Sequence, residues 1–144
     1  MNDRSPLREV TLVLPMAPDM ELVASQAASA LAAFVGMSSD RVDEVRMAVV
    51  EACINAIEHS DASDGLLYLH IAVLGHDRPE TLQITVRDHG VGFDREKLVQ
   101  PKIEEKIGAS SKRGWGLKII EGLMDHVAVH SGEAGTSVVM SKAL

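Results

Sequence analysis

The sequence predicts an α+β fold, a two-layer sandwich in which helices pack on one face of a mixed, mainly antiparallel sheet. Two observations indicate this class. Segments with strand-like patterns follow one another in pairs within 66–87 and 126–141, and segments with helical patterns are grouped at 19–59. A doubly wound sheet would require strands and helices to alternate strictly. With 144 residues, the chain has the length of one domain, which we place over 1–144. We expect the second sheet face to be left for solvent or a partner.

The first part of the chain contains one predicted strand and two predicted helices. Residues 8–14 alternate between apolar and polar side chains and are followed by a proline, which is typical of a strand. Residues 19–35 are rich in alanine and leucine and stop at a glycine, which favours a helix with a C-terminal glycine. A second helix begins after Ser38-Ser39, has aspartates in its first turn and ends near His59.

The second part is dominated by two predicted hairpins. Their strands lie at 66–74, 81–87, 126–131 and 136–141. Between the hairpins, residues 94–113 lack a clean period and are predicted to be a long loop with some helix. A helix opened by glycine is predicted over about 115–124.

The composition limits the classes of ligand. The formal net charge is −7 and the pI is about 5.3, which argues against nucleic acid because a phosphate backbone requires a basic surface. No apolar run approaches the roughly 20 residues of a membrane-spanning helix, and the first residues lack the apolar stretch of a signal peptide. The single cysteine cannot form an internal disulfide, which fits a reducing compartment. We therefore expect a cytoplasmic protein that contacts neither nucleic acid nor membrane directly.

The second predicted helix carries a carboxylate and a carboxamide on one face. Glu51 and Asn55 are four residues apart, so their side chains lie one turn from each other. The carboxylate can activate an attacking hydroxyl, and the amide oxygen can ligate a magnesium ion that holds a phosphate chain. The alternative is ordinary amphipathicity, in which this polar face meets water while Val45, Val49 and Cys53 face the core. In both cases we expect Cys53 to be a core residue rather than a reactive thiol.

A glycine-punctuated loop follows the strand predicted at 81–87. In Asp88-x-Gly90-x-Gly92-Phe93 the aspartate lies where the chain turns sharply at the end of the strand. A buried carboxylate at this place can accept a hydrogen bond from the exocyclic amine of adenine. The alternative is a plain turn, since Asp-x-Gly is a common turn signal. The loop is not the glycine fingerprint of a dinucleotide-binding fold, because no helix opens within it.

A second glycine pair precedes the last predicted helix. Backbone amides at a helix N-terminus bind anionic phosphates, and Gly114 and Gly116 allow a close approach. Lys112 and Arg113 add positive charge immediately before them. The alternative is a flexible loop joined to a core helix, with Trp115 as a packing residue. A Walker-type phosphate loop is excluded because its glycine-lysine signature is absent from the sequence.

Together, the three segments resemble the N, G1 and G2 boxes of the Bergerat ATP-binding fold, which gyrase and histidine kinases share. Within that fold the chain is most similar to the anti-sigma-factor serine/threonine protein kinases of bacterial partner-switching systems. The matching motifs are Glu51-x-x-x-Asn55-Ala56-x-x-His59, Asp88-x-Gly90-x-Gly92-Phe93 and Arg113-Gly114-x-Gly116-Leu117. The likeness runs nearly end to end, from the first strand to the Gly135-Thr136 turn and the last strand.

The resemblance implies ATP and Mg²⁺ as cofactors and a role for each matching residue. Glu51 would be the general base and Asn55 the magnesium ligand, while Asp88 would bind adenine. The remaining nucleotide-binding residues would be Gly90 and Gly92 at the base, Thr136 near the adenine, His59 near the nucleotide, and Lys112 or Arg113, Gly114, Trp115, Gly116 and Leu117 around the phosphates. Residues at about 94–113 would form the ATP lid.

The implied function is that of an Mg-ATP-dependent protein serine/threonine kinase that regulates transcription as an anti-sigma factor. It would phosphorylate an antagonist protein of the STAS type, and a sigma factor would compete for an overlapping surface on a homodimer. Two alternatives remain. A nucleotide-dependent binding module would transfer nothing, and the retained Glu51 argues against it. The ATP-binding module of a histidine kinase would follow a dimerisation helix with a phosphoacceptor histidine, which we do not expect here.

Overall fold

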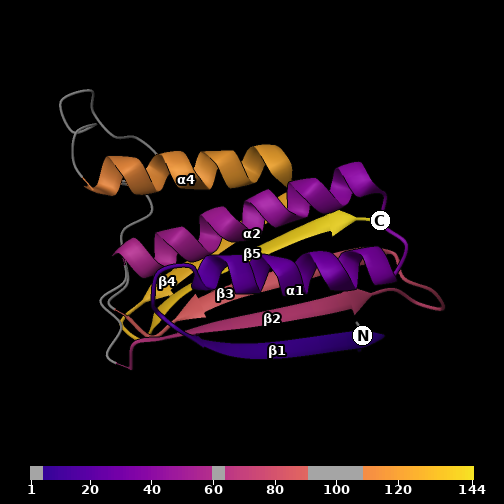
Figure 1. The fold of residues 1–144 in the computed structure, drawn as a ribbon, viewed down its shortest axis with the longest axis horizontal. Helices are drawn as coiled ribbons and strands as arrows, with labels where there is room; N and C mark the ends of the chain where they lie inside the picture. The colour runs from indigo at the N-terminus through magenta and orange to yellow at the C-terminus, as the bar shows by residue number, and fades with distance from the viewer. Residues whose placement is uncertain (1–4, 60–63, 91–108) are drawn as a thin grey trace.

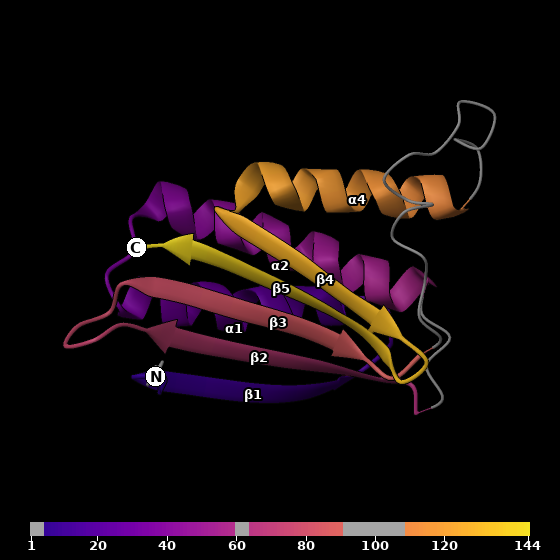
Figure 2. The same cartoon turned by 180° about the vertical axis from the view of Figure 1, so that it is seen from behind.

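The computed structural model describes residues 5–59, 64–90 and 109–144, with 109–115 described as backbone only. Its helices and strands follow in the order β1 (Arg8–Pro15), α1 (Met20–Phe34), α2 (Ser39–His59), β2 (Leu66–Leu74), β3 (Thr81–Asp88), α4 (Ala109–Leu123), β4 (His126–Gly132) and β5 (Gly135–Ala143). The strands form one sheet, and the three helices lie on one of its faces (Figure 1). No element of the described ranges covers the opposite face (Figure 2). The predicted two-layer α+β architecture is therefore confirmed.

The strand order across the sheet is β1-β2-β3-β5-β4, and every neighbouring pair is antiparallel. We expected a mixed sheet that was mainly antiparallel. Strands β3 and β4 do run in the same direction, because the connection through α4 is a crossover, but they are not neighbours. The last strand, β5, returns from β4 and pairs with both. This insertion removes the parallel contact and places residues of β5 directly opposite those of β3.

The first two helices begin and end close to the predicted positions. Helix α1 ends at Phe34, shortly before Gly36, whose φ of 98° lies in the left-handed region that favours glycine. Helix α2 runs from Ser39 to His59, as its serine-rich start predicts. Within the described ranges, none of the helices has both the length and the apolar character needed to cross a membrane.

Helix α4 differs from the prediction. We expected it to open at the glycine pair near residue 115, but it starts at Ala109, so Gly114 and Gly116 lie inside it. A glycine within a helix costs about 1 kcal/mol relative to alanine. Helix α4 packs alongside α2 (Figure 1), and such packing contributes more to helix stability than local propensity does. The packing on α2 is a tertiary contact that sequence periodicity does not contain, and the helix includes the glycines that we expected at its start.

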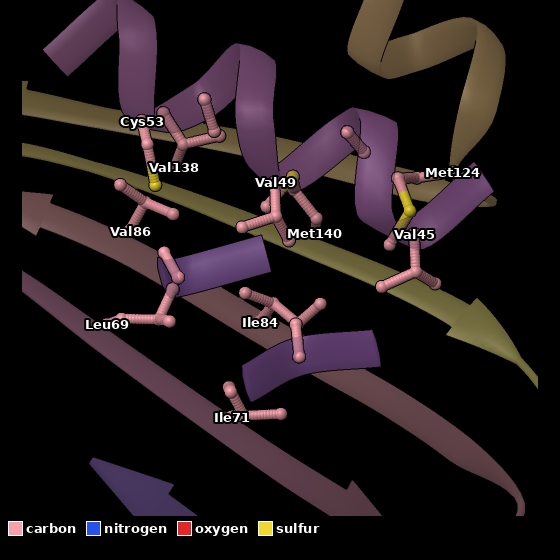
Figure 3. Close-up of a cluster of buried hydrophobic side chains, with 14 of the residues drawn as sticks. Val45, Val49, Cys53, Leu69, Ile71, Ile84, Val86, Met124, Val138 and Met140 are labelled. Atoms are coloured by element: carbon pink, nitrogen blue, oxygen red, sulfur yellow. The ribbon is translucent and has the colours of Figure 1, made fainter. Parts of the chain in front are cut away.

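The core lies between the sheet and the helices. The buried side of α1 consists of small residues, which let this helix approach closely: Ala24, Ser25, Ala28, Ser29 and Ala32. Figure 3 shows Cys53 of α2 directed at Val86 and Val138 of the sheet. Burial, with a smaller contribution from the Glu21 carboxylate, raises the pKa of the Cys53 thiol to about 12. Cys53 is fully buried in the core cluster, which confirms that it is a core residue.

A buried lysine fastens the C-terminal end of α4 to the rest of the domain. Lys142 of β5 is 6% exposed, and its Nζ donates a hydrogen bond of 2.6 Å to the carbonyl oxygen of Leu123. The same Nζ lies 3.3 Å from a carboxylate oxygen of Glu44 on α2. The carboxylate of Asp125 accepts a hydrogen bond of 2.7 Å from the amide of Ala143. These contacts hold α4 against both α2 and the sheet.

Candidate functional site

Four elements enclose a pocket at one end of the domain. Two strands supply its floor and two helices its walls, and the space within it is about 300 Å³ when the solvent at its mouth is counted. The residues that line it are Ala52, Asn55 and Ala56 of α2, Val86 and Asp88 of β3, Leu117 of α4, and Thr136 and Val138 of β5. The structure thus brings together four predicted site residues from the three motifs and from the last strand: Asn55, Asp88, Leu117 and Thr136.

The pairing of β3 with β5 builds the floor. Asp88 lies directly opposite Thr136 in the antiparallel register, and Val86 lies opposite Val138. Because side chains alternate along a strand, these four residues project from the same face of the sheet, towards the helices. The result is an apolar surface of two valines that ends in a carboxylate and a hydroxyl. Such a floor suits a flat, largely apolar ring with polar groups at its edge.

The Asp88 side chain is fixed in the pocket. It is 4% exposed, and its Oδ1 atom accepts a hydrogen bond of 2.8 Å from the amide of Gly90. Among the residues that the structure describes, no donor is bonded to its second oxygen, Oδ2. The pocket therefore offers an acceptor whose direction is set by the turn itself. An exocyclic amine such as that of adenine is a matching donor.

Asn55 lies directly against the second glycine motif. A Cβ atom placed on Gly116 would come within 2.6 Å of the Asn55 Nδ2 atom and 3.1 Å of its Oδ1 atom. Asn55 therefore holds its position because residue 116 has no side chain. We predicted this glycine as a point of close approach for phosphates, and the structure adds a second reason for it. The two motifs contact each other through the carboxamide that is expected to bind magnesium.

This contact leads to a prediction with a matched control on the same helix. We expect Gly116→Ala to weaken magnesium-dependent ATP binding by roughly tenfold, because overpacking of about 1–3 kcal/mol would have to be relieved by moving Asn55. Gly122→Ala is the control, since nothing lies within 4 Å of a Cβ at that position. It should leave binding unchanged and stabilise the helix by about 0.5–1 kcal/mol. Titration calorimetry and thermal unfolding measure the two effects. Equal ATP affinities in the two variants would show that this contact does not set the position of the ligand.

A third glycine, Gly135, lies directly against the backbone of Asp88. Gly135 has a φ of 130°, and a Cβ atom placed on it would lie 2.0 Å from the carbonyl oxygen of Asp88. The turn between β4 and β5 therefore passes directly against the end of β3. This explains physically why a glycine precedes Thr136 in the last motif.

Two predicted residues of α2 do not line the pocket. Glu51 is half-buried one turn before Asn55, on the face that the sequence predicts, but it is not part of the described wall. His59 is half-buried at the end of α2, and its Nε2 atom lies 3.9 Å from a carboxylate oxygen of the neighbouring Glu58. Their roles as general base and nucleotide contact stay predictions.

The second glycine motif is only partly described. The backbone of residues 112–115 is helical, so Gly114 and Gly116 do not stand at a helix N-terminus as we expected. The side chains of Lys112, Arg113 and Trp115 lie outside the described part of the structure, as do Gly92 and most of the lid expected at 94–113. Their contacts with phosphate stay predictions. Gly90 is described, and it is buried beside Asp88.

Sequence reasoning missed the apolar lining of the pocket. Ala52 and Ala56 flank Asn55 on α2, and Val86 and Val138 form the floor. The strand alternation places the two valines on the helix-facing side, but the pattern alone does not distinguish a pocket floor from ordinary core. The small size of the two alanines beside Asn55 was the available signal, since small side chains leave room for a ligand.

The described residues fit a magnesium ion that is held largely by its nucleotide. They contain no group of three or more His, Cys, Asp or Glu side chains that could hold a metal ion. Magnesium in nucleotide sites usually binds one or two protein oxygens together with phosphates and water. The Asn55 carboxamide, which lines the same pocket as Asp88, can supply one such oxygen.

Comparisons with known proteins show the family to which this chain is related. The family model for the histidine kinase-like ATPase domain matches residues 16–142. The serine-protein kinase RsbW of Listeria innocua is 32% identical over 140 residues, which cover 93% of this chain and 86% of that protein. The anti-sigma F factor of Anoxybacillus flavithermus is 35% identical over 121 residues, which cover 79% and 80%. A crystal structure of the RsbU and RsbW domains of a Mycobacterium tuberculosis protein superimposes with a TM-score of 0.69 at 19% identity, over 96% of this chain and 33% of that one. At this identity the last likeness concerns the fold alone.

Proposed function

Because the chain belongs to the histidine kinase-like ATPase family and, within it, to the branch of anti-sigma serine-protein kinases, we propose that it is an Mg-ATP-dependent protein serine/threonine kinase. It acts as the anti-sigma factor of a partner-switching system and phosphorylates an antagonist protein of the STAS type. The observation that supports this most directly is the pocket in which the Asp88 carboxylate, the Asn55 carboxamide and Leu117 of α4 meet.

Binding of the nucleotide follows from the lining of the pocket. Val86 and Val138 would support the adenine ring, and the Oδ2 atom of Asp88 would accept a hydrogen bond from its amine, with Thr136 beside it. The phosphates then extend along α2 towards the second glycine motif. Magnesium, when bound by Asn55 and the phosphates, neutralises the charge that develops during transfer.

The transfer step requires a base near the phosphate end. Glu51 lies one turn before Asn55 on α2, so its carboxylate takes the proton of an incoming serine or threonine hydroxyl. The hydroxyl oxygen forms a bond to the γ-phosphorus, the bond to the β-phosphate oxygen breaks, and ADP leaves. The acceptor is a serine or threonine of a separate antagonist protein, which the likeness to relatives named serine-protein kinase supports. A sigma factor competes with the antagonist for an overlapping surface on a homodimer, so the phosphorylation state of the antagonist determines which partner is bound.

The experiment is a transfer assay with radiolabelled ATP, magnesium and candidate STAS-type antagonist proteins. We expect an acid-stable phosphoester on the antagonist, formed only when this chain and magnesium are both present. A label confined to this chain and lost in acid would instead indicate a histidine kinase. A nucleotide-dependent complex without label on either protein would indicate a binding module, the other alternative.

A further inference from the structure

A cluster of three side chains lies beside the pocket, where β2 begins and β3 ends. We call Asp64, Tyr68 and His89 the rim cluster. The Oδ2 atom of Asp64 accepts a hydrogen bond of 2.8 Å from the Tyr68 hydroxyl, and it lies 3.0 Å from the Nδ1 atom of His89. The imidazole also packs on the Tyr68 ring, with 4.6 Å between the ring centroids. A single carboxylate therefore joins the segment before β2 to the segment after β3.

The carboxylate at the centre of the rim cluster is itself held in place. Its other oxygen, Oδ1, accepts a hydrogen bond of 3.0 Å from the amide of Leu66. This hydrogen bond, followed by those from Tyr68 and His89, lowers the pKa of Asp64. Asp64 is therefore ionised at neutral pH and remains an acceptor. It fixes the direction in which the His89 ring points.

His89 occupies a position that controls the adenine-side turn. It stands between Asp88 and Gly90, the two residues joined by the hydrogen bond that orients the Asp88 carboxylate. Its Cα atom would lie 2.9 Å from a Cβ placed on Gly135, so the backbone at His89 is also pressed against the turn between β4 and β5. The backbone is held from one side by that turn, and the side chain is tied to Asp64 on the other. Rotation of this peptide segment would displace Asp88.

The rim cluster contributes little to global stability. The side chains of His89 and Asp64 are 37% and 28% exposed, and pairs that solvent screens in this way stabilise folded proteins only weakly. A contact that is weak for folding can still restrict the orientation of a neighbouring binding group. The benefit then appears in ligand affinity, because the bound geometry exists before the ligand arrives.

We propose that His89, held by Asp64 and Tyr68, is a positioning residue that sets the preference of this pocket for a purine bearing an exocyclic amine. The proposal rests on the nucleotide-binding function proposed above. His89 acts through Asp88 and does not itself touch the reacting atoms. It keeps the Asp88–Gly90 turn closed, so that the Oδ2 atom of Asp88 points at the amine.

The test compares ATP with inosine triphosphate, which lacks the exocyclic amine, by titration calorimetry in the presence of magnesium. We expect His89→Ala to weaken ATP binding by roughly fivefold, the effect of one hydrogen bond of about 1 kcal/mol. Binding of inosine triphosphate should change by less than about twofold, on the same reasoning that only the contact to the amine is affected. His89→Asn keeps an N–H donor near the position of Nδ1 and should restore most of the ATP affinity. His76→Ala, an exposed histidine in the turn between β2 and β3, is the matched control and should change neither affinity.

Two further measurements separate positioning from a general structural role. The double variant Asp64→Ala/His89→Ala should bind ATP no more weakly than His89→Ala, because Asp64 acts on Asp88 through His89. The melting temperature of His89→Ala without nucleotide should match that of the His76→Ala control. Three results would overturn the positioning role while the wild-type chain still binds ATP. They are equal losses of affinity for both nucleotides in His89→Ala, weaker ATP binding by the double variant than by His89→Ala, and a lowered melting temperature of His89→Ala. Failure of the wild-type chain to bind ATP would overturn the proposed nucleotide function, and the role of His89 with it.

Discussion

Replacement of Glu51 by alanine is expected to lower phosphoryl transfer to the antagonist by roughly 10²–10⁴-fold, the usual effect of a lost general base. Nucleotide affinity should stay within about a few-fold of the wild-type value, because a residue that acts only on the attacking hydroxyl contributes to transfer and not to ground-state binding. The physical reason is the placement of Glu51. It is half-buried one turn before Asn55 and does not line the pocket proposed for adenine. Single-turnover transfer at saturating ATP measures the chemical step, and calorimetry measures binding.

Glu80→Ala is the matched control for this variant. Glu80 is an exposed glutamate just before β3, so its removal makes the same change of charge and side-chain volume. It should leave the transfer rate unchanged. Transfer at the wild-type rate in Glu51→Ala would show that another group accepts the proton. Equal slowing in both variants would point to the net charge of the domain rather than to a general base.

The second large effect is expected for Asp88→Asn. The Gly90 amide should keep the carbonyl oxygen of the new side chain at the place of Oδ1. The amide nitrogen would then replace Oδ2 and face the amine of adenine, donor against donor. A buried polar group left without its partner costs about 1–3 kcal/mol, so ATP affinity should fall by roughly 5–150-fold. GTP, whose base lacks an amine at this position, should be affected far less. Calorimetry with both nucleotides measures the difference.

Asp77→Asn provides the control for the change of charge. Asp77 is exposed in the turn between β2 and β3 and is not part of the pocket lining. Its replacement should alter neither ATP nor GTP affinity. If Asp88→Asn bound ATP as tightly as the wild-type chain, the carboxylate would not be the group that recognises adenine by accepting its hydrogen bond. A loss of equal size for both nucleotides would indicate that the variant distorts the turn and does not remove a specific hydrogen bond.

Local sequence patterns determined most of the secondary structure. Two-residue alternation marks β3, a continuous apolar run marks β2, and a glycine ends α1, so each of these elements lies within a residue or two of its predicted range. The reason is that strand alternation and helix-ending glycines are properties of a short stretch of backbone. The face that joins Glu51 to Asn55 is equally local, since it depends only on the helical repeat. The direction of Cys53 towards the core follows from the same repeat, and its burial confirms it.

The tertiary structure decided how these elements meet. Insertion of β5 between β3 and β4 brings Thr136 opposite Asp88 and makes all neighbouring strands antiparallel. Packing of α4 on α2 places Gly116 directly against Asn55, within a helix that begins at Ala109. Neither result follows from periodicity, because each depends on contacts between residues far apart in the chain, and a glycine motif is equally compatible with a helix start and a helix interior. Local patterns therefore predicted which residues could contact a nucleotide, and the packing of α4 and β5 places four of them, Asn55, Asp88, Leu117 and Thr136, around one pocket.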